Sequence, residues 1–536
     1  MGFRVSGAAV IAAMCCVLAG ESFAQTGPVD PGVRGGLQGT GGGLQAKGIQ
    51  IPHPPVISPN PTTGATISNN EFNSFFEGIA RAGQLESTCD QCAMVTDGSP
   101  AVKNPINGLT ELDSIFPQFT TNSNGLGARH NADQCFACHF QPGLGGSGGF
   151  LVPNPVDLAR SGPSAARPPE NPQFDLIPHR FGKQNVAPSF EQQYGPIREV
   201  RFIYQVDSNG NFVLDANGNR IIDGGVHQLW VVRGIQNDPT IPQCALTQPD
   251  FEKQVKQGNV AFRIPLQMLG LGLIDSIQDR EILARQAATA PQRAALGIAG
   301  HPNRSGNDGT ITRFGWKAQN KSLTMFAGEA YNVEMGITNE LFPQAKEEDP
   351  NCNGPQKPEP NDVTRMDKND QINQAFNNPL HILADWMQFN LLMRFTDGPQ
   401  PDPAPSASAI HGKDVFGRIG CALCHTPTMQ TAPVLISAVL QNRPVNLFSD
   451  LLLHNMGAGL ADGISQGQAG PREFRTTPLW GVGQRIFFLH DGRTNDLLQA
   501  IQAHGSSGSE AIGVVSNFEA LSVSDKQAIL DFLRSL

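Results

Sequence analysis

Two copies of one five-residue pattern constrain this chain more than any other feature. In each copy two cysteines are separated by two residues and a histidine follows at once, as CFACH and CALCH. Thiols three positions apart lie on one side of a helical turn, where each can add to a vinyl group of one porphyrin, and the adjacent imidazole can bind the iron. The copies therefore predict two covalent c-type haems, held by Cys135, Cys138 and His139 and by Cys421, Cys424 and His425.

Zinc and a redox-active dithiol are the alternatives to haem at these two motifs. A zinc site needs four ligands at one centre, and a thioredoxin-like pair needs no histidine after the second cysteine. Two complete copies of the pattern therefore favour haem.

The remaining cysteines indicate disulfides. Cys89 and Cys92 also form a C-x-x-C pair, but no histidine follows it, so a local disulfide is expected there. Cys244 and Cys352 can then pair with each other in an oxidising compartment. A reactive dithiol at Cys89 and Cys92 is the alternative, although nothing nearby in the sequence lowers a thiol pKa.

The first 24 residues have the layout of a secretory signal peptide. One arginine precedes an apolar run from residue 8 to 19, and small residues precede Gln25. The run is too short to span a bilayer comfortably, and no later segment reaches transmembrane length. We therefore expect a periplasmic or otherwise exported protein without a membrane span.

The charge of the chain limits its partners. The formal net charge is −10. Nucleic acid and anionic membranes require a basic face and are not expected as partners. A basic protein that docks on an acidic patch remains possible.

The remaining patterns predict a mainly α-helical protein with long irregular loops. Helical spacing occurs at about 70–87, 276–297, 368–395 and 522–536, after a Gly- and Pro-rich flexible segment at 25–66. Residues 195–235 alternate like strands and have Asn-Gly turns, which predicts β-hairpins. The Asp- and Asn-rich turns at 207–211 and 215–219 are expected to serve turn geometry, with calcium binding as the alternative.

Each motif has a similar companion segment downstream. Aromatic-rich stretches lead to Trp316 and to His490, and a leucine follows each seven residues later, at Leu323 and Leu497, where a helical pattern begins. Trp316 lies 177 residues after His139, whereas His490 lies 65 residues after His425. The first half therefore carries an insertion, placed at about 151–300. We predict two cytochrome c-like haem domains, at 67–400 and 401–536.

The companion segments resemble bacterial dihaem cytochrome c peroxidases. FSDLLLHNMG and FRTTPLWGVGQRIFFLHDGRTNDLLQAIQAHG look like their C-terminal half, and GWKAQNKSLTMFAGEAYNVEMG looks like their N-terminal segment. The closest similarity is to the exported dihaem oxidoreductases described as peroxidases or thiol oxidoreductases. It rests on GLGARHNADQCFACHFQPGLGGS, NVAFRIPLQMLGLGLI and EMGITNELFP, and it covers roughly residues 70–536.

For the second haem, the resemblance implies His504 as the sixth iron ligand. The family places Met or Tyr at this position, so a histidine is a departure. Ligation by two histidines suits electron transfer at low potential. The alternative is that His504 is a surface helix residue, with His454 and Met456 as other ligands.

For the first haem, a departure from the family predicts an open iron face, because peroxidases that need reductive activation carry a dissociable distal histidine a short way after the haem motif. Residues 140–178 contain no histidine, and the next one is His179. The distal acid/base maps onto Glu334, which can take a proton from one oxygen of peroxide and deliver it to the other. Glu334 as a solvated carboxylate at a helix end is the alternative, and Met335 beside it is a further candidate ligand.

Trp316 matches the tryptophan that lies between the two haems in the family and is the expected electron relay. WKA replaces the usual WDG after it, and a structural core role is the alternative. Together these residues predict a peroxidase that reduces hydrogen peroxide at the first haem. Its electrons would come through the second haem from a small donor such as a c-type cytochrome or a cupredoxin. The alternatives are a dihaem enzyme that oxidises an organic or protein substrate, and a non-catalytic electron-transfer cytochrome.

Overall fold

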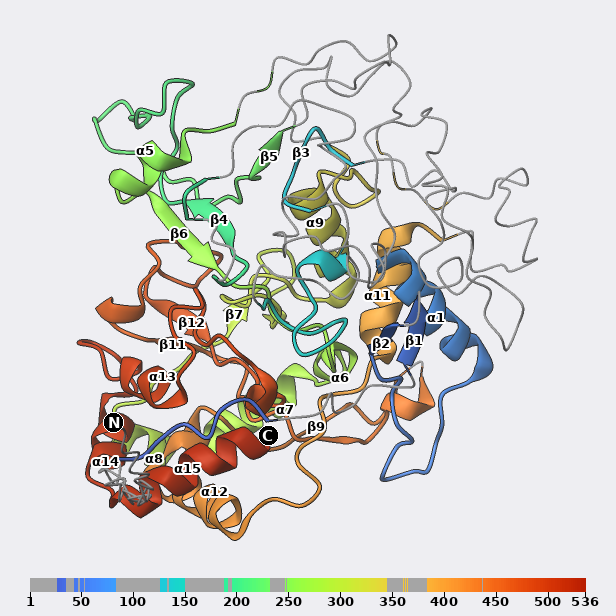
Figure 1. Ribbon diagram of the computed structural model, residues 1–536, viewed down its shortest axis with the longest axis vertical. Helices are drawn as coiled ribbons and strands as arrows, with labels where there is room; N and C mark the ends of the chain where they lie inside the picture. The colour runs from blue at the N-terminus through green and yellow to red at the C-terminus, as the bar shows by residue number, and fades with distance from the viewer. Residues whose placement is uncertain are drawn as a thin grey trace, which may run out of the picture.

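The structure is a computed structural model of the chain (Figure 1). It describes residues 27–34, 43–46, 49–52, 54–82, 126–132, 135–149, 188–190, 195–231, 246, 248–344, 360, 362, 364, 383–435 and 437–536. The signal peptide, the four cysteines at 89, 92, 244 and 352, and His179 lie outside these residues, so the predictions for them stay predictions.

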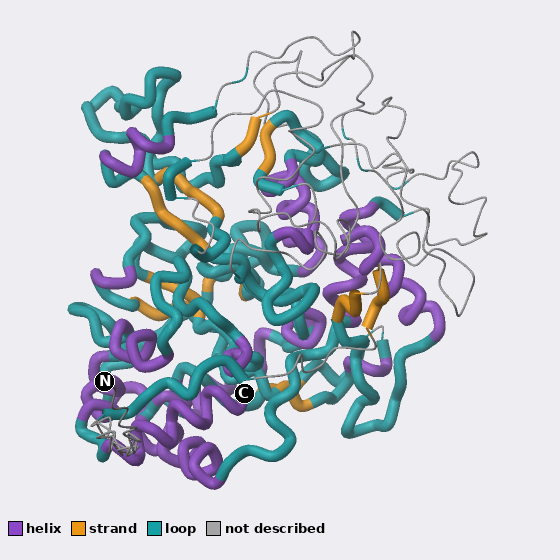
Figure 2. Tube along the Cα trace, in the orientation of Figure 1, coloured by secondary structure: helices purple, strands orange, loops and turns teal. Residues whose placement is uncertain are grey.

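Helices dominate the regular structure of the described residues, as the sequence predicts, and long loops connect them (Figure 2). The helices are α1 (Asn69–Ala82), α5 (Phe251–Lys256), α6 (Leu271–Asp275), α7 (Asp279–Ala288), α8 (Ala290–Ala295), α9 (Leu323–Met335), α11 (Asp385–Phe395), α12 (Ala407–Ile419), α13 (Leu497–Ala503), α14 (Ile512–Glu519) and α15 (Val523–Ser535).

The strands are short and form antiparallel pairs. The pairs are β1 (Gly43–Ala46) with β2 (Ile49–Pro52), β3 (Arg129–His130) with β5 (Trp230–Val231), β4 (Glu199–Phe202) with β6 (Val260–Arg263), β7 (Asn303–Arg304) with β8 (Ile311–Thr312), β9 (Met429–Gln430) with β10 (Pro444–Val445), and β11 (Leu453–Asn455) with β12 (Glu473–Arg475). In the pair of β4 with β6, Glu199 lies opposite Arg263 and Arg201 lies opposite Ala261.

Two helical groups surround the two Cys-x-x-Cys-His motifs. In one group α11 packs against α1 and α9, and in the other α12 packs against α15 and α14 (Figure 1). The largest apolar cluster combines residues on both sides of the predicted boundary near 400, for example Phe75 and Leu392 with Leu447 and Trp480. A second cluster joins α12 and α15 through Phe416 and Phe532, whose ring centroids are 5.3 Å apart.

The helices predicted near 70–87 and at the C-terminus are confirmed in the residues that the structure describes, as α1 and α15. The Ser522 hydroxyl caps α15 by accepting a hydrogen bond from the backbone N–H of Asp525 at 3.1 Å. The helical stretch predicted at 276–297 is confirmed as two consecutive helices, since α7 ends at Ala288 and α8 begins at Ala290. Pro291 lacks an N–H and its ring blocks the preceding turn, which interrupts the helix.

The predicted hairpins are present after β4. Tyr204 bridges Ile222, Val206 bridges Phe212, and Leu214 bridges Arg220. The carboxylates of the two Asp-Asn turns bind their own backbone, since Asp207 accepts from the N–H of Asn211 at 2.8 Å and Asp215 from that of Asn219 at 2.8 Å.

The first of these two turns binds a lysine side chain. The Lys253 ammonium donates to the carbonyl of Asn209 and to the side-chain oxygen of Asn211, both at 2.8 Å. These contacts support a structural role for the first turn.

Part of the Gly- and Pro-rich segment contacts the C-terminal helix. Asp30 forms an ion pair with Arg534 of α15 at 2.7 Å, and the N–H of Val29 donates to Gln527 at 2.8 Å. Residues 27–34 are therefore anchored, although the sequence predicts a flexible segment there. Among the described residues, no helix is both long and apolar enough to span a bilayer.

Candidate functional site

The second Cys-x-x-Cys-His motif follows α12 directly. Gly420 ends the helix in the left-handed conformation, with φ of 106°, and Cys421–Leu423 form a single 3-10 turn. The N–H of His425 donates to the carbonyl of Cys421 at 2.9 Å, which holds the histidine beside the two cysteines. Cys421, Cys424 and His425 all line one cavity of about 220 Å³, here called the second cavity.

His425 presents one free nitrogen to this cavity. Its Nδ1 donates to the carbonyl of Phe448 at 3.1 Å, because a carbonyl can only accept, and Nε2 is left for a metal. Burial, together with the nearby His504 ring, lowers the pKa of His425 to about 4. The imidazole is therefore neutral, as an iron ligand must be.

His504 lies in the same cavity, as the sequence predicts. It caps the C-terminal end of α13, and its Nδ1 donates to the carbonyl of Ala500 at 2.7 Å. Burial lowers the pKa of His504 as well. Two neutral imidazoles, each with Nδ1 occupied and Nε2 available, thus share one cavity.

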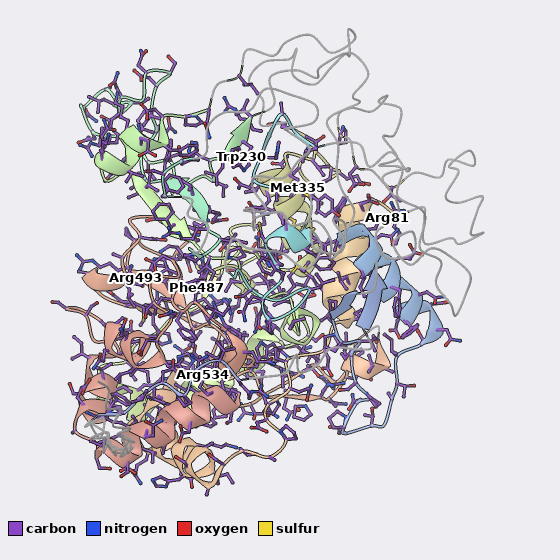
Figure 3. The ribbon with its side chains drawn as sticks, viewed as in Figure 1. Arg81, Trp230, Met335, Phe487, Arg493 and Arg534 are labelled. Carbon is purple, nitrogen blue, oxygen red and sulfur yellow. The ribbon has the colours of Figure 1, made fainter. Side chains whose placement is uncertain are left out.

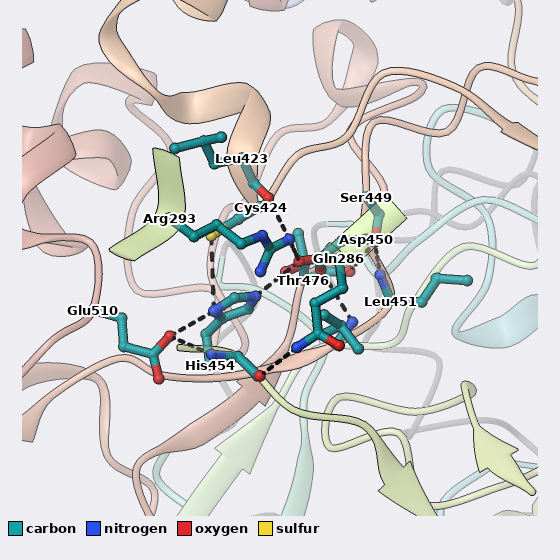
Figure 4. Close-up of polar contacts among 12 residues, drawn as sticks. Gln286, Arg293, Leu423, Cys424, Ser449, Asp450, Leu451, His454, Thr476 and Glu510 are labelled. Carbon is teal, nitrogen blue, oxygen red and sulfur yellow. Dashed lines mark hydrogen bonds and ion pairs between the residues drawn. The ribbon is translucent and has the colours of Figure 1, made fainter. Parts of the chain in front are cut away.

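A third histidine of the second cavity, His454, has no free nitrogen. His454 Nε2 lies 3.0 Å from Asp450 Oδ2, and Nδ1 lies 2.8 Å from Glu510 Oε2 (Figure 4). Burial opposes a charge on this ring, but Asp450 and Cys424 raise the pKa of His454 well above its usual value. An imidazolium between two carboxylates is a poor iron ligand, which leaves His504 as the better candidate.

Arg293 completes this buried network from a distant part of the chain. Its guanidinium, carried by α8, donates to Asp450 at 2.6 Å and to the carbonyl of Leu423 at 2.5 Å, inside the second motif (Figure 4). Both Arg293 and Asp450 are buried. Helix α8 of the predicted insertion is therefore fastened to the second cavity by a buried ion pair.

Replacing Arg293 with Met is expected to lower the free energy of unfolding by about 3–5 kcal/mol, because it leaves the buried Asp450 with only one positive partner. Chemical denaturation followed by circular dichroism measures the change. Arg285→Met is the control on the neighbouring helix α7. The Arg285 side chain is 43% exposed, against 3% for that of Arg293, and it pairs with Glu281 at 2.8 Å, so about 1 kcal/mol or less is expected. Equal effects of the two variants would contradict the structural role of Arg293.

The first motif has the same local geometry. Cys135–Ala137 form a 3-10 turn, and the N–H of His139 donates to the carbonyl of Cys135 at 3.1 Å. His139 Nδ1 donates to the carbonyl of Gly146 at 3.3 Å, and burial lowers the pKa of His139. Cys135, Cys138 and His139 line a cavity of about 140 Å³, here called the first cavity.

The glycines after the first motif let the chain fold back on itself. A Cβ on Gly146 would lie 2.2 Å from the carbonyl oxygen of Gln141, and a Cβ on Gly148 would lie 2.7 Å from the ring of Pro265. No side chain fits at either position. The loop can therefore deliver the Gly146 carbonyl to His139 only because these residues are glycines.

A pair of carboxylates lies across the first cavity. Glu334 comes from the last turn of α9, and Glu199 comes from β4. Asn131 Nδ2 donates to Glu334 Oε2 at 2.7 Å, and Arg201 Nε donates to Glu199 Oε1 at 2.5 Å. The predicted acid/base Glu334 is therefore placed in the first cavity with three polar partners that the sequence analysis did not identify: Glu199, Arg201 and Asn131.

The two carboxylates have opposite protonation tendencies. Burial and the neighbouring charge of Glu199 raise the pKa of Glu334 to about 8. Burial opposes a charge on Glu199 too, but Arg201 and Arg263 hold the pKa of Glu199 below its usual value. At neutral pH the pair therefore carries one proton, which resides on Glu334, while Glu199 is ionised.

A sequence signal for Glu199 and Arg201 exists. They stand two positions apart in a strand whose other residues, Val200 and Phe202, are buried. Charged side chains at alternate positions of an apolar strand share one face, and that face needs a polar environment. The alternation of charged and apolar residues indicates that such an environment exists, but it does not identify that environment as the first cavity.

The half-repeat predicted from the sequence is confirmed in the backbone. Helices α9 and α13 begin at Leu323 and Leu497. Before each helix, equivalent residues form the same isolated bridge, Phe314 with Asn320 and Phe488 with Thr494. The two segments therefore align without a gap, and equivalent residues are separated by a constant number of positions in the sequence.

This register identifies the counterpart of His504 in the first half. His504 stands seven residues after Leu497, and the residue seven after Leu323 is Ala330. Ala330 lines the first cavity as His504 lines the second. Among the described residues, His139 is the only histidine that lines the first cavity, so no imidazole opposes it there.

Trp316 lines both cavities. Its Nε1 donates to the carbonyl of Ile264 at 2.9 Å, and its ring meets His490 edge to face at 6.3 Å between centroids. The predicted position between the two sites is therefore occupied by this indole. His490 in turn stacks on Phe474 at 4.4 Å, and burial lowers the pKa of His490 to about 4.

Met335 lines the first cavity at the end of α9 (Figure 3), but it also belongs to the main apolar cluster and is buried there. Met456 lines the second cavity and packs with the apolar cluster around Trp316. Both positions are compatible with a packing role.

The structure thus has two similar cavities, each lined by one Cys-x-x-Cys-His motif, and the Trp316 side chain lines both. Residues 240–536, more than half of the chain, match the family described as "Di-haem oxidoreductase, putative peroxidase". The chain belongs to this di-haem oxidoreductase family. Haem is therefore its cofactor, and the neutral imidazoles and paired cysteines of both cavities fit that group.

No curated protein matches the chain. Among solved structures, the chain is similar to hydrazine synthase of Kuenenia stuttgartiensis pressurized with xenon, with 16% identity over 30% of this chain and a TM-score of 0.19. The match spans 56% of that chain. A likeness this weak bears on neither fold nor function.

Proposed function

We propose that the protein is an exported dihaem c-type peroxidase. Cys135 and Cys138 would hold one haem covalently, with His139 on its iron, and Cys421 and Cys424 would hold the other, with His425 and His504 on its iron. The first site would reduce one hydrogen peroxide to two waters by consuming two electrons and two protons. When bound, the haems supply the electron transfer that accompanies cleavage of the O–O bond.

The observation that carries this proposal is the difference between the two halves at one helix position. His504 lines the second cavity together with His425, whereas Ala330, at the equivalent helix position, lines the first. A second imidazole suits a site that only transfers electrons, and its absence leaves room for a small substrate. The first cavity therefore fits the reactive site and the second the electron-transfer site.

The residues across the first cavity fit the proton chemistry of this reaction. Glu199 is ionised and can accept a proton from peroxide, while Glu334 is protonated and can donate one to the departing oxygen. Arg201 holds Glu199 in place through their 2.5 Å contact, and Asn131 holds Glu334 at 2.7 Å. This division of roles refines the expectation that Glu334 performs both steps.

Trp316 is the proposed electron relay because it lines both cavities and its indole N–H is held by the carbonyl of Ile264. The external donor would be a small protein such as a c-type cytochrome or a cupredoxin. A positively charged donor surface would suit a chain whose formal net charge is −10.

Electron paramagnetic resonance of the purified ferric protein tests the proposal. We expect one low-spin signal from the second haem and one high-spin component from the first, which changes when cyanide or peroxide is added. Steady-state turnover with a reduced small cytochrome and peroxide is the matching activity measurement. Two purely low-spin signals that ignore both ligands would instead indicate an electron-transfer cytochrome and contradict the peroxidase proposal.

A further inference from the structure

Arg485 is a buried guanidinium without a counter-charge among the described residues. Its side chain is 7% exposed, and its Nε and one terminal nitrogen have no hydrogen-bond partner. Burial alone lowers the pKa of Arg485 to about 10, and no carboxylate offsets the effect. Moving an unpaired ion from water into a protein interior costs several kcal/mol of free energy. A bound anion beside Arg485 would offset this cost.

Arg475 beside it is also incompletely neutralised. It is 6% exposed, and its Nε donates to the carbonyl of Gly315 at 3.0 Å. The carboxylate that acts on it is Asp450, which already pairs with Arg293 and His454. By contrast, other buried arginines have carboxylates of their own, as Arg263 has Asp462 at 2.8 Å and Arg534 has Asp30 at 2.7 Å.

Arg475 and Arg485 both line a small cavity of about 30 Å³ that shares lining residues with each of the two larger cavities. Arg475, Arg485 and Thr477 line both this small cavity and the second cavity. Gly315 and Phe326 line both the small cavity and the first cavity. Cys421, Cys424 and His425 line the second cavity but not the small one, so Arg475 and Arg485 lie at the part of the second cavity that adjoins the small cavity.

The chemistry of haem separates its carboxylates from its bonds to the cysteines. Cysteines of a C-x-x-C-H motif bond to the two vinyl groups, and the two propionates leave from the opposite part of the porphyrin. An arginine guanidinium binds a carboxylate through two parallel hydrogen bonds, and the low polarity of the interior strengthens them.

We propose that Arg475 and Arg485 bind the propionate carboxylates of the second haem and raise the reduction potential of its iron. The positive charges favour the reduced iron, which carries one positive charge fewer than the oxidised iron. The inference rests on the haem-binding part of the proposed function and is independent of its peroxidase part.

Arg485→Gln tests the proposal in the haem-loaded protein. Spectroelectrochemical titration is expected to show a lower midpoint potential for the second haem and little change for the first. Arg493→Gln is the control, because Arg493 (Figure 3) is exposed and pairs with Asp491 at 2.7 Å. In this variant the midpoint potential of neither haem should change. Haem content, measured as the pyridine haemochrome, shows that both variants are loaded.

Arg485→Lys provides a second variant that keeps the charge, and its second haem should have a potential between those of wild type and Arg485→Gln. If Arg485→Gln does not fold, Arg485→Lys and Arg475→Gln carry the test, and unchanged potentials in both would overturn the proposal. A shift confined to the first haem would overturn the assignment to the second.

A free anion at the arginines is distinguished by titration with chloride. A free anion would make the wild-type midpoint potential depend on chloride at constant ionic strength, and that dependence would overturn the assignment to a propionate. A loaded wild type that does not turn over peroxide would end the peroxidase proposal and leave this test intact.

Discussion

Glu334→Gln is expected to lower kcat for peroxide reduction by about 10²–10⁴-fold, the usual contribution of a positioned acid or base. The glutamine keeps the size of the side chain and can still meet Asn131 near the first cavity, but it has no acidic proton to give to the departing oxygen. Stopped-flow oxidation of a reduced cytochrome donor by peroxide measures the rate, and the ferric spectrum shows whether the first haem is otherwise unchanged.

The pH profile separates a proton donor from a merely structural carboxyl. Burial and Glu199 raise the pKa of Glu334 to about 8, so the folded protein keeps this carboxyl protonated at neutral pH. As the pH rises through about 8, the carboxyl loses the proton that it would donate, and wild-type kcat is expected to fall. In Glu334→Gln the residual rate should lose this decline.

Glu329→Gln is the matched control. Glu329 stands on the same helix and lines the same cavity, but its carboxylate accepts a hydrogen bond from Asn320. Its replacement should change kcat by less than about tenfold and leave the decline near pH 8 in place, because the Glu334 proton remains. Equal losses in the two variants, or full activity in Glu334→Gln, would remove Glu334 from the reaction.

The sequence predicts those parts of the site that depend on local spacing. The Cys-x-x-Cys-His turns need only five consecutive residues, and each forms the same single 3-10 turn. The companion segments are predicted to the residue at the starts of α9 and α13, because Leu323 and Leu497 mark each start, and the structure adds a capping side chain before each, Ser322 or Asp496.

Contacts between distant segments are not predictable from such spacing. Glu199 reaches Glu334 only because β4 pairs with β6, and that register is a property of the tertiary fold. Arg293 of α8 meets Asp450, which stands 157 residues further along the chain, and no local pattern joins the two. The hydrophobic periodicity of the sequence indicates that such buried charged groups need partners. It does not identify the partner residues, because these are determined by the tertiary packing.

The half-repeat yields the prediction with the largest spectroscopic effect. Ala330→His places an imidazole at the counterpart of His504, seven residues into α9 and facing the first cavity. We expect the new ring to bind the first iron, so that the high-spin component disappears and a second low-spin signal replaces it. Peroxide turnover should fall by about 10²-fold or more, because the substrate no longer has an open position.

Ala330→Leu is the control, since it fills a similar volume without a ligand atom and should keep the high-spin component even if its bulk slows turnover. The reciprocal change, His504→Ala, should convert the second haem to high spin and slow electron delivery while leaving the first haem unchanged. If His504→Ala instead keeps two unchanged spectra, the second iron takes its ligand elsewhere, and the register between the halves loses its functional meaning. If Ala330→His remains high-spin and fully active, helix α9 does not face the first iron as α13 faces the second, and the division into a reactive and an electron-transfer haem fails.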